Sequence, residues 1–361
     1  MKKNRVVVAM SGGVDSSLAA ALLVEQGFDV VGVTMHLSDE NRDAAPDERS
    51  CCSLSSVDDA RRVADVLKIP HYVMDFSVQF KHTVIDYFFH EYLCGRTPNP
   101  CIACNHHVKF EGLLHKSEAL GASWIATGHY ARIDRDDKGI YRLRKGLDHE
   151  KDQSYVLYHL NQATLACVLF PLGGFSKREV RQMAEKYHLP VAHKAESQEI
   201  CFVPHDDYKA YLREKCPKSI RPGKVVDQMG NVLGTHDGIA FYTIGQRKGL
   251  GIAASTPLYV TKLDAAANQV IVGTADKVYA HELTAFDLSW TMWDTLKEQR
   301  MVQAKIRYGK REAEATIYPC DETRIRVRFT EPQRAATPGQ SVVFYENDIV
   351  LGGGVIDQVI S

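Results

Sequence analysis

The first 200 residues alternate short apolar runs with amphipathic stretches. Residues 5–10 form a β-branched apolar run that is typical of a buried strand, and residues 56–67 carry apolar side chains at helical spacing. The next elements are expected at residues 72–76 (a buried strand), 78–93 (a helix that ends at Gly95) and 124–127 (a strand). This alternation predicts a mostly parallel sheet with helices on both faces.

Polar residues at the ends of the periodic stretches suggest where helices begin. Asn105 could cap a helix that runs to Gly121. Ser176-Lys-Arg-Glu179 has the pattern of a capping box, and the helix behind it is expected to stop at Pro190.

The local amino-acid composition changes near residue 205, where Gly and Pro become frequent. Farther on, short runs alternate apolar and polar residues, as in 301–307 and 313–318, and Gly339 and Gly352–Gly354 are expected to punctuate the strands. We therefore predict an N-terminal α/β domain, a small mixed central domain and a C-terminal β-barrel. Their expected bounds are 1–205, 206–280 and 281–361.

Composition narrows the class of protein. The chain has 361 residues, 45% hydrophobic and 25% charged, with a net charge of −1. It contains no apolar run long enough for a membrane span and no signal peptide, which favours a cytoplasmic protein without a membrane partner. Its nine cysteines, an odd number in a long chain, do not suggest a secreted disulfide scaffold. A nucleic-acid partner would need a local basic surface, because the net charge is close to zero.

The loop Ser11-Gly-Gly-Val-Asp-Ser-Ser17 is the strongest local signal. It joins the first apolar run to Leu18–Val24, which is expected to be helical. Backbone amides at a helix N-terminus, close-approaching glycines and hydroxyl donors together make an anion site. The loop is neither a Walker A sequence nor Gly-x-Gly-x-x-Gly. An ordinary glycine turn is the plain alternative.

Cysteines provide the second signal. Cys101-Ile-Ala-Cys104 has a spacing that suits a metal, a redox dithiol or a nucleophile with a partner. A structural zinc site is not favoured, because no second pair has that spacing. Cys201 lies in a polar loop after a helix, and in isolation it would be taken as an inert buried thiol. The remaining cysteines are expected to be inert: Cys51, Cys52, Cys94, Cys167, Cys216 and Cys320.

Taken together and in order, the motifs resemble one family over essentially the whole chain. Ser11–Ser16 resembles the pyrophosphate loop of the PP-loop ATPases, which are adenine nucleotide α-hydrolase-like. The full set resembles the bacterial tRNA-specific 2-thiouridylases. The motifs that carry this resemblance are Ser11–Ser16, Gly95–Pro100 with Cys104-Asn105, Ala126–Ala131, Lys151–Ser154, Ser197–Cys201 and Tyr242–Gly251.

The resemblance implies an activity and its partners. The enzyme would use ATP and Mg²⁺ to adenylate the C2 oxygen of uridine 34, the wobble base of tRNAs for Lys, Glu and Gln. Sulfur would then replace the oxygen. It would arrive as a persulfide from a cysteine desulfurase or a sulfur-carrier protein. The target base would be swung out of the anticodon loop to be reached.

The resemblance also implies residue roles. Cys201 would carry the persulfide, and Cys104 would be the nucleophile that releases the sulfur, leaving a Cys104–Cys201 disulfide. ATP would be bound by Ala9, Met10, Ser11, Gly12, Gly13, Val14, Asp15, Ser16, Ser17, Met35 and Gly128. tRNA would be contacted by Asn99, Pro100 and Cys101 around the target base, and by His129, Lys151, Asp152, Gln153, Arg307, Tyr308 and Gln340.

Cys101 departs from the best-known branch of that family, which has an Asp proposed as a general acid/base at this position. A thiol with an ordinary pKa is a poorer proton shuttle than such a carboxylate. Cys101, Cys104 and Cys201 could instead hold a [4Fe–4S] cluster whose open iron presents hydrosulfide to the base. The sequence leaves the cluster and the persulfide relay open.

Two other functions compete with this interpretation. One is another PP-loop enzyme, of the amidotransferase or argininosuccinate synthetase type, which would need no thiols. The other is an RNA-binding or redox-sensing module with a degenerate nucleotide site. Loss of activity on replacing Cys104 and Cys201 argues against the first, and pyrophosphate release in the presence of tRNA argues against the second.

Overall fold

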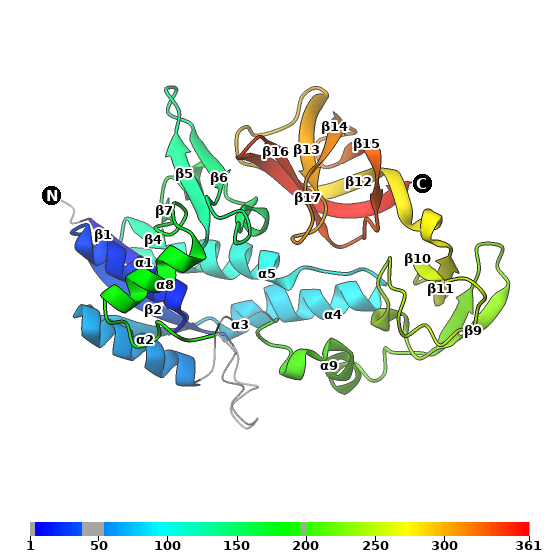
Figure 1. The fold of residues 1–361 in the computed structure, drawn as a ribbon, viewed down its shortest axis with the longest axis horizontal. Helices are drawn as coiled ribbons and strands as arrows, with labels where there is room; N and C mark the ends of the chain where they lie inside the picture. Colours follow the sequence, from blue (N-terminus) through cyan, green and yellow to red (C-terminus); the bar gives the residue numbers. More distant parts are fainter. Residues whose placement is uncertain (1–3, 38–53, 196–199, 361) are drawn as a thin grey trace. The chain divides into compact units, whose positions relative to one another are not determined.

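The computed structural model in Figure 1 describes residues 4–37, 54–195 and 200–360. The predicted inert pair Cys51 and Cys52 lies outside these residues. The chain forms two compact units. Unit 1 contains residues 1–84, 101–206 and 348–350, and unit 2 contains residues 85–100, 207–347 and 351–361. Within the described residues, no helix is both long and apolar enough to cross a bilayer.

Unit 1 is built on a five-stranded parallel sheet, as the alternating pattern predicted. The strand order is β3-β2-β1-β4-β7. The strands are β1 (Arg5–Ala9), β2 (Asp29–His36), β3 (His71–Asp75), β4 (Trp124–Ala126) and β7 (Val168–Leu169). The helices and 3₁₀ turns of this unit include α1 (Val14–Glu25), α2 (Leu54–Leu67), η3 (Ser154–Leu157), α7 (Gln162–Leu165), α8 (Lys177–Lys186) and η4 (Pro204–Asp206).

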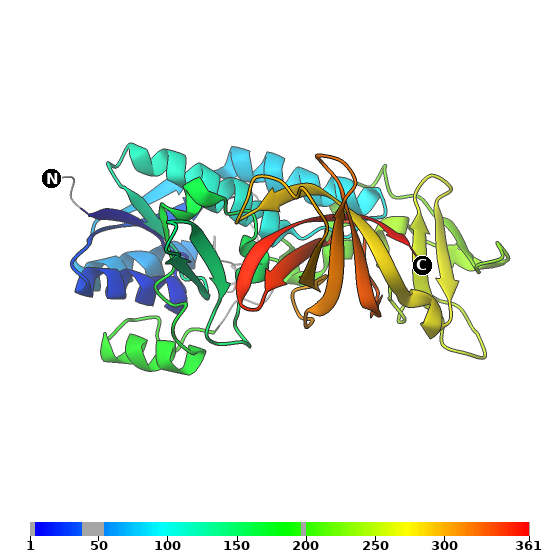
Figure 2. The same cartoon turned by 90° about the horizontal axis from the view of Figure 1, so that it is seen from above.

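The central strand β1 is buried on both faces. Val6, Val7 and Val8 have no exposed surface, which is typical of an inner strand of a parallel sheet. Val6 and Val8 pack with apolar residues of α1, α2 and α8 in one core. Figure 2 shows blue α1 and green α8 on one side of this sheet and the cyan helical segment after residue 100 on the other.

A strand was correctly predicted near residues 72–76, but the prediction that it is buried was wrong. The strand forms, at His71–Asp75, but it is the last strand of the sheet, and Tyr72 and Val73 are exposed. A continuous apolar run marks a strand covered on both faces only where the strand lies inside the sheet. Whether a strand lies at the edge or inside the sheet depends on the topology of the fold, and the apolar run at 72–76 does not reveal it.

Two long helical segments contain π-helical turns. One comprises α3 (Ser77–Phe80), η1 (Lys81–Ile85) and α4 (Asp86–Leu93), and Gly95 follows it with φ +70°, as predicted. The other comprises α5 (Pro100–Ala103), η2 (Cys104–Gly112) and α6 (Leu113–Glu118).

The prediction that Asn105 caps the second segment was wrong, because the helix starts five residues earlier. Pro100 occupies its first position, where its fixed φ is favourable and its missing N–H is not needed. Asn105 lies inside η2 and is buried. The capping box at Ser176 is present with both of its hydrogen bonds, and α8 follows it.

An antiparallel hairpin in unit 1 was not predicted. Strands β5 (Ala131–Arg135) and β6 (Tyr141–Lys145) pair with each other, and Ile349 pairs with Arg144. Arg144 also bridges Asp134 and Asp348 at 2.7 and 2.6 Å. The hairpin strands are rich in charged residues, so the apolar pattern that reveals the other strands is weak here.

Unit 2 contains two β structures and short helices. A four-stranded sheet has the order β10-β11-β8-β9, and six antiparallel strands close into a barrel in the order β12-β15-β14-β13-β16-β17 with β12 pairing β17. The small-sheet strands are β8 (Gly223–Val226), β9 (Val232–His236), β10 (Tyr259–Asp264) and β11 (Gln269–Gly273). The helical elements are α9 (Tyr208–Lys215), η5 (Ile239–Phe241) and η6 (Ala275–Val278). The barrel strands are β12 (Tyr279–Trp290), β13 (Arg300–Lys305), β14 (Ala313–Pro319), β15 (Ile325–Arg334), β16 (Ser341–Glu346) and β17 (Ile349–Ile360).

The barrel confirms the prediction of a C-terminal all-β structure, with one correction. Gly339 lies between strands, as expected, but Gly352–Gly354 lie inside β17. A Cβ atom on Gly352 would come within 2.3 Å of the Ser289 carbonyl oxygen on the neighbouring β12. Gly352 and Gly354, whose Cβ atoms would both meet β12 backbone oxygens, therefore permit close strand packing in the barrel instead of ending a strand.

Candidate functional site

The glycine loop runs directly from β1 into α1. The helix begins at Val14, and not at Leu18 as predicted, with Gly13 as its N-cap at φ −96° and ψ 164°. The Ser16 and Ser17 hydroxyls donate to the Gly13 carbonyl oxygen at 3.2 and 2.8 Å. Asp15, Ser16 and Ser17 thus form the first helical turn, where backbone amides and the helix dipole favour an anion.

Two glycines let other segments approach this loop. Gly12 has φ +71°, and a Cβ atom there would lie 2.2 Å from the Ser56 carbonyl oxygen of α2. A Cβ atom on Gly128 would lie 2.7 Å from the Ser16 amide nitrogen. The loop, α2 and the end of β4 therefore meet at the carboxyl edge of the sheet, as predicted for Gly128. Met35 lies near the same edge, at the end of β2.

Charged side chains that the sequence analysis missed surround the loop. Lys177 Nζ contacts both Asp15 carboxylate oxygens at 2.7 and 2.8 Å, and Tyr130 Oη donates to Asp15 at 2.7 Å. Lys194 Nζ lies 3.2 Å from the Gly12 carbonyl oxygen and 2.7 Å from Asp59. The fold thus supplies two lysines to a loop that has none in its own sequence. The Ser176 capping box was the available signal, since it fixes Lys177 at the start of α8.

Lys177→Met is expected to raise the KM for ATP by roughly tenfold or more. Without the ammonium, the Asp15 carboxylate would face the nucleotide phosphates uncompensated. Steady-state ATP kinetics check this, with Lys186→Met at the exposed end of the same helix as the matched control. Equal KM values for the two variants would show that Lys177 does not contribute to ATP binding.

The Cys-x-x-Cys pair lies on one continuous helical segment. Cys101 is exposed in α5, whereas Cys104 opens η2 and is buried. The neighbouring Asn105 donates its side-chain amide to the Val156 carbonyl oxygen at 3.0 Å, which ties η2 to η3. The buried Asn105 Oδ1 finds no hydrogen-bond partner among the described residues. The two thiols therefore share one rigid element but differ in access to solvent.

Cys201 is held by contacts of the residue that follows it. Phe202 packs edge-to-face on Phe80 of α3 at 5.6 Å. The residue before Phe80, Gln79, donates its side-chain amide to the His107 carbonyl oxygen of η2 at 2.7 Å. The short helix α3 therefore contacts both the turn that carries Cys201 and the helix that carries Cys104, although 97 residues separate the two thiols in the sequence.

Cys101, Cys104 and Cys201 belong neither to a disulfide nor to a single-ion site among the described residues. Among the described residues, the one group of three or more His, Cys, Asp or Glu side chains with metal-ligand spacing contains no cysteine. No disulfide joins the described cysteines either. These observations show neither a single-ion site nor a disulfide on Cys101, Cys104 and Cys201 among the described residues, and they do not test a [4Fe–4S] cluster, whose thiolates bind different irons.

The predicted tRNA-contacting residues of unit 1 differ in their surroundings. Asp152 is buried, and its oxygens accept from the Gly146 amide and from the amide and hydroxyl of Ser154. Gln153 Oε1 accepts from the Tyr130 amide at 2.9 Å. Asp152 thus holds the two ends of the segment 146–154, which contains the partly exposed Lys151, and Gln153 joins this segment to Tyr130.

His129 is a buried imidazole of unit 1, and His159 is a half-buried one whose Nε2 atom is inaccessible to solvent. Burial, and then the charge of Lys109, holds the pKa of His129 well below 6.5. Burial, and then the nearby His106 and His107, does the same to the pKa of His159. His129 Nδ1 pairs with the Thr127 hydroxyl at 2.7 Å. Any contact between His129 and tRNA would therefore come from a neutral ring.

These two histidines predict a loss of stability in weak acid. Their folded-state pKa values lie below the unfolded value of 6.5, so the unfolded chain binds protons first as the pH falls. The stability is complete above pH 6.5 and is lost below it, by up to about 1.4 kcal/mol per pH unit for each histidine. Urea unfolding between pH 8 and 5 checks this, and His159→Gln is expected to flatten the slope. An unchanged slope in that variant contradicts the assignment.

In unit 2, Gln340 and Arg307 form hydrogen bonds that connect neighbouring loops. Gln340 Nε2 donates to the carbonyl oxygens of Thr97 and Pro98 at 2.9 and 3.2 Å. An Arg307 guanidinium nitrogen lies 2.8 Å from the Thr337 hydroxyl. The Thr97 hydroxyl contacts Thr243 at 3.2 Å. These bonds fasten the segment that leads to Asn99 onto the barrel and the 242–251 motif.

Tyr308 and Asn99 both reach the surface of the protein. Tyr308 is 43% exposed, and Asn99 is partly exposed directly before the helix that carries Cys101. Exposed aromatic and amide side chains of this kind suit contacts with unstacked bases and phosphates. The predicted tRNA residues are thus distributed over both units.

An open parallel sheet whose first strand passes through Ser-Gly-Gly-x-Asp-Ser into a helix defines a PP-loop nucleotide-binding domain, here followed by a small β domain and a β-barrel. Three family models match: the tRNA methyl transferase HUP domain at residues 4–205, the tRNA methyl transferase PRC-barrel domain at 209–274 and the aminomethyltransferase beta-barrel domain at 280–356.

Full-length relatives specify the family within that class. A tRNA-specific 2-thiouridylase MnmA of Acetivibrio thermocellus is 53% identical over 358 residues, 99% of this chain and 100% of that protein. A protein of the same description from Clostridium perfringens is 50% identical over 360 residues, covering both chains completely. The chain belongs to the tRNA-specific 2-thiouridylase family.

Proposed function

We propose that the protein converts uridine 34 of tRNAs for Lys, Glu and Gln to 2-thiouridine in an ATP-dependent reaction. The observation that carries this proposal is the identity of about half of all residues with named 2-thiouridylases along the whole chain. The family-model ranges also support a division into domains at 1–205, 206–280 and 281–361.

The first step is adenylation of the base. The amides of the first turn of α1, with the Ser16 and Ser17 hydroxyls, would bind the departing pyrophosphate, and Lys177 and Lys194 would balance its charge. The C2 oxygen attacks the α-phosphorus, and pyrophosphate leaves with the electron pair of the broken P–O bond. Mg²⁺ on the phosphates would supply further neutralisation, and the Asp15 carboxylate is an oxygen donor of the type that Mg²⁺ prefers.

The second step is sulfur transfer. Cys201 would receive a sulfane sulfur from an external persulfide, a cysteine desulfurase or a sulfur carrier. The terminal sulfur attacks C2 of the activated base, and AMP leaves with the former C2 oxygen. The Cys104 thiolate attacks Cys201 Sγ, which breaks the S–S bond and leaves a Cys104–Cys201 disulfide that an external thiol reduces. The docking of both thiol segments on α3 supports this relay.

Cys101 would then lie beside the base without carrying sulfur. Its exposed position in α5, one turn before Cys104, supports a place at the entrance to the site. We favour the two-thiol relay over the cluster, because it needs no third ligand. If the relay operates and Cys101 stands in the place of a carboxylate, Cys101→Asp would keep or raise activity. If a cluster operates, Cys101→Asp would lose the cluster and the activity with it.

tRNA binding is assigned to both units. Lys151, Arg307, Tyr308, Gln340 and His129 would contact the anticodon arm, and Asn99, Pro100 and Cys101 would surround the flipped base. Because Asp152 and Gln153 hold backbone in this structure, their contribution would be to present Lys151 and the adjoining backbone.

The products of ATP test the proposal against its two rivals. With tRNA, ATP and a persulfide donor, AMP, pyrophosphate and 2-thiouridine should appear in equal amounts, and without the donor pyrophosphate should appear without 2-thiouridine. Formation of ADP and phosphate would contradict adenylation. Full activity after joint replacement of Cys104 and Cys201 would point to another PP-loop enzyme, and tRNA binding without pyrophosphate release would point to a binding module.

A further inference from the structure

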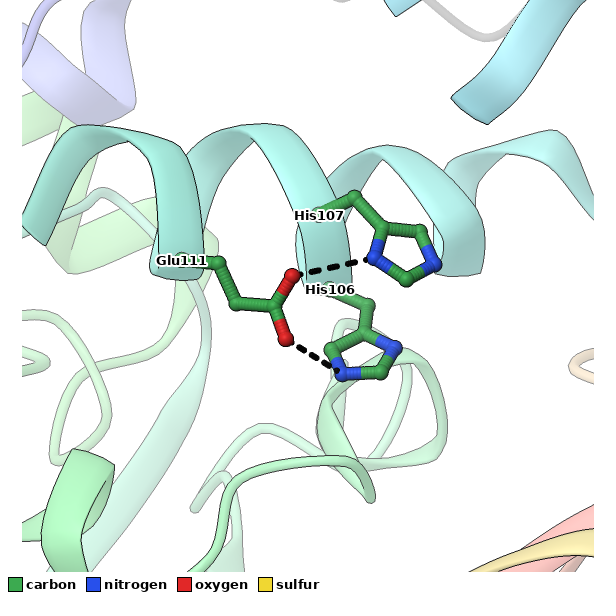
Figure 3. A group of neighbouring side chains, drawn as sticks. All are labelled: His106, His107 and Glu111. Carbon is green, nitrogen blue, oxygen red and sulfur yellow. Dashed lines mark hydrogen bonds and ion pairs between the residues drawn. The ribbon is translucent and has the colours of Figure 1, made fainter. Parts of the chain in front are cut away.

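Two histidines and a glutamate converge on the helix that carries Cys104. His106 Nε2 lies 3.1 Å from Glu111 Oε1, and His107 Nδ1 lies 3.0 Å from Glu111 Oε2 (Figure 3). One donor atom from each residue lies within 4.8 Å of the others. Two imidazole nitrogens and a carboxylate oxygen are a donor set that first-row transition metals accept in proteins.

The π-helical turn creates this cluster. Residues 104–112 form η2, in which the hydrogen bonds span five residues instead of four. In an α-helix, residues five apart are roughly 140° apart around the axis. The wider turn brings both the fourth and the fifth residue before Glu111 back to its face. His107 and His106 therefore reach the same carboxylate, one oxygen each.

Stacking orients the imidazoles before any ligand is present. The His106 ring stacks on His107 with centroids 4.2 Å apart, and on His159 at 4.4 Å with an interplanar angle of 7°. His159 is half-buried, and its ring packs in turn on Tyr158 at 3.9 Å. A metal ligand whose orientation is fixed by packing loses less conformational freedom on binding.

We propose that His106, His107 and Glu111 bind one divalent transition-metal ion of the Zn²⁺ and Co²⁺ class. One nitrogen of each imidazole and the Glu111 carboxylate are the ligands, and water completes the coordination. The side chains are 32%, 39% and 57% exposed, which gives the ion and its water ligands access. Small rotations of the rings and the carboxylate bring the donors from their present hydrogen bonds to metal-ligand distances. This site does not depend on the proposed function.

Titration with Co²⁺ tests the site. The full-length protein, without a histidine tag, reduced and freed of metal, is expected to bind one Co²⁺ per chain with weak visible bands typical of nitrogen and oxygen ligands, and Zn²⁺ is expected to displace it. His106→Ala and His107→Ala should each weaken binding by roughly tenfold or more. Glu111→Gln should weaken it while preserving the size of the side chain, so that a folding defect in a histidine variant does not decide the result.

The exposed His115 of α6, on the same helical segment, provides the matched control. His115→Ala is expected to bind Co²⁺ as the unaltered chain does. Three results would each overturn the proposal: affinity unchanged by the His106 and His107 variants, an intense sulfur-to-cobalt charge-transfer band that assigns the ion to cysteines, or no uptake at a tenfold excess of Co²⁺.

Discussion

Replacing Cys201 by Ser is expected to lower 2-thiouridine formation by roughly a hundredfold or more while tRNA-dependent pyrophosphate release from the adenylation step continues. A serine hydroxyl cannot form a persulfide, but the nucleotide loop and its lysines lie in other segments of unit 1. Nucleoside analysis and pyrophosphate release, measured on the same reaction, check this separation.

Cys104→Ser is expected to stop the relay one step later. tRNA should accumulate in covalent linkage to Cys201 through the unbroken S–S bond, because the thiolate that would attack Cys201 Sγ is missing, and mass spectrometry after nuclease digestion should find this adduct. Cys216→Ser is the matched control, since burial raises the pKa of the Cys216 thiol and makes it a poor nucleophile. Thiolation at the normal rate in Cys201→Ser or Cys104→Ser would contradict the relay.

Gly12→Ala is expected to reduce AMP formation by roughly a hundredfold or more. The new Cβ atom would lie 2.2 Å from the Ser56 carbonyl oxygen, so either the loop or the start of α2 must move. Displacing the loop misaligns the amides that stabilise the departing pyrophosphate. AMP release and ATP binding are the measurements.

Gly27 offers a matched control for Gly12. It also has a positive φ, +81°, but a Cβ atom there would meet nothing within 4 Å among the described residues. Both substitutions should cost about 1 kcal/mol of stability for the left-handed conformation, whereas Gly27→Ala should keep its activity. If the two variants lose activity equally, backbone strain and not the close approach of α2 explains the effect.

The sequence predicted the features whose causes are local. The Ser176 capping box, the turn at Gly95 and the alternating barrel strands all formed where short-range patterns placed them. The α1 N-terminus was misplaced because Asp15, Ser16 and Ser17 were assigned to the loop, although the same residue types are common in a first helical turn.

Features that depend on tertiary contact could not be predicted in this way. Lys177 lies 162 residues from Asp15, and no local pattern connects them. The exposure of Tyr72 follows from the position of β3 at the end of the sheet, and Gly352 and Gly354 of β17 follow from the backbone of β12 beside them. The π-turn of η2 lacks a sequence signature, yet it decides which side chains share a face with Glu111.

The most direct test of the proposed function is nucleoside mass spectrometry of a defined tRNA. An unmodified tRNA transcript for Glu, incubated with the protein, ATP, Mg²⁺ and a persulfide donor, is expected to gain one 2-thiouridine, and a transcript with cytidine at position 34 is expected to gain none. Thiolation at another position, methylation of the tRNA, or an unmodified uridine 34 while AMP accumulates would contradict the proposal.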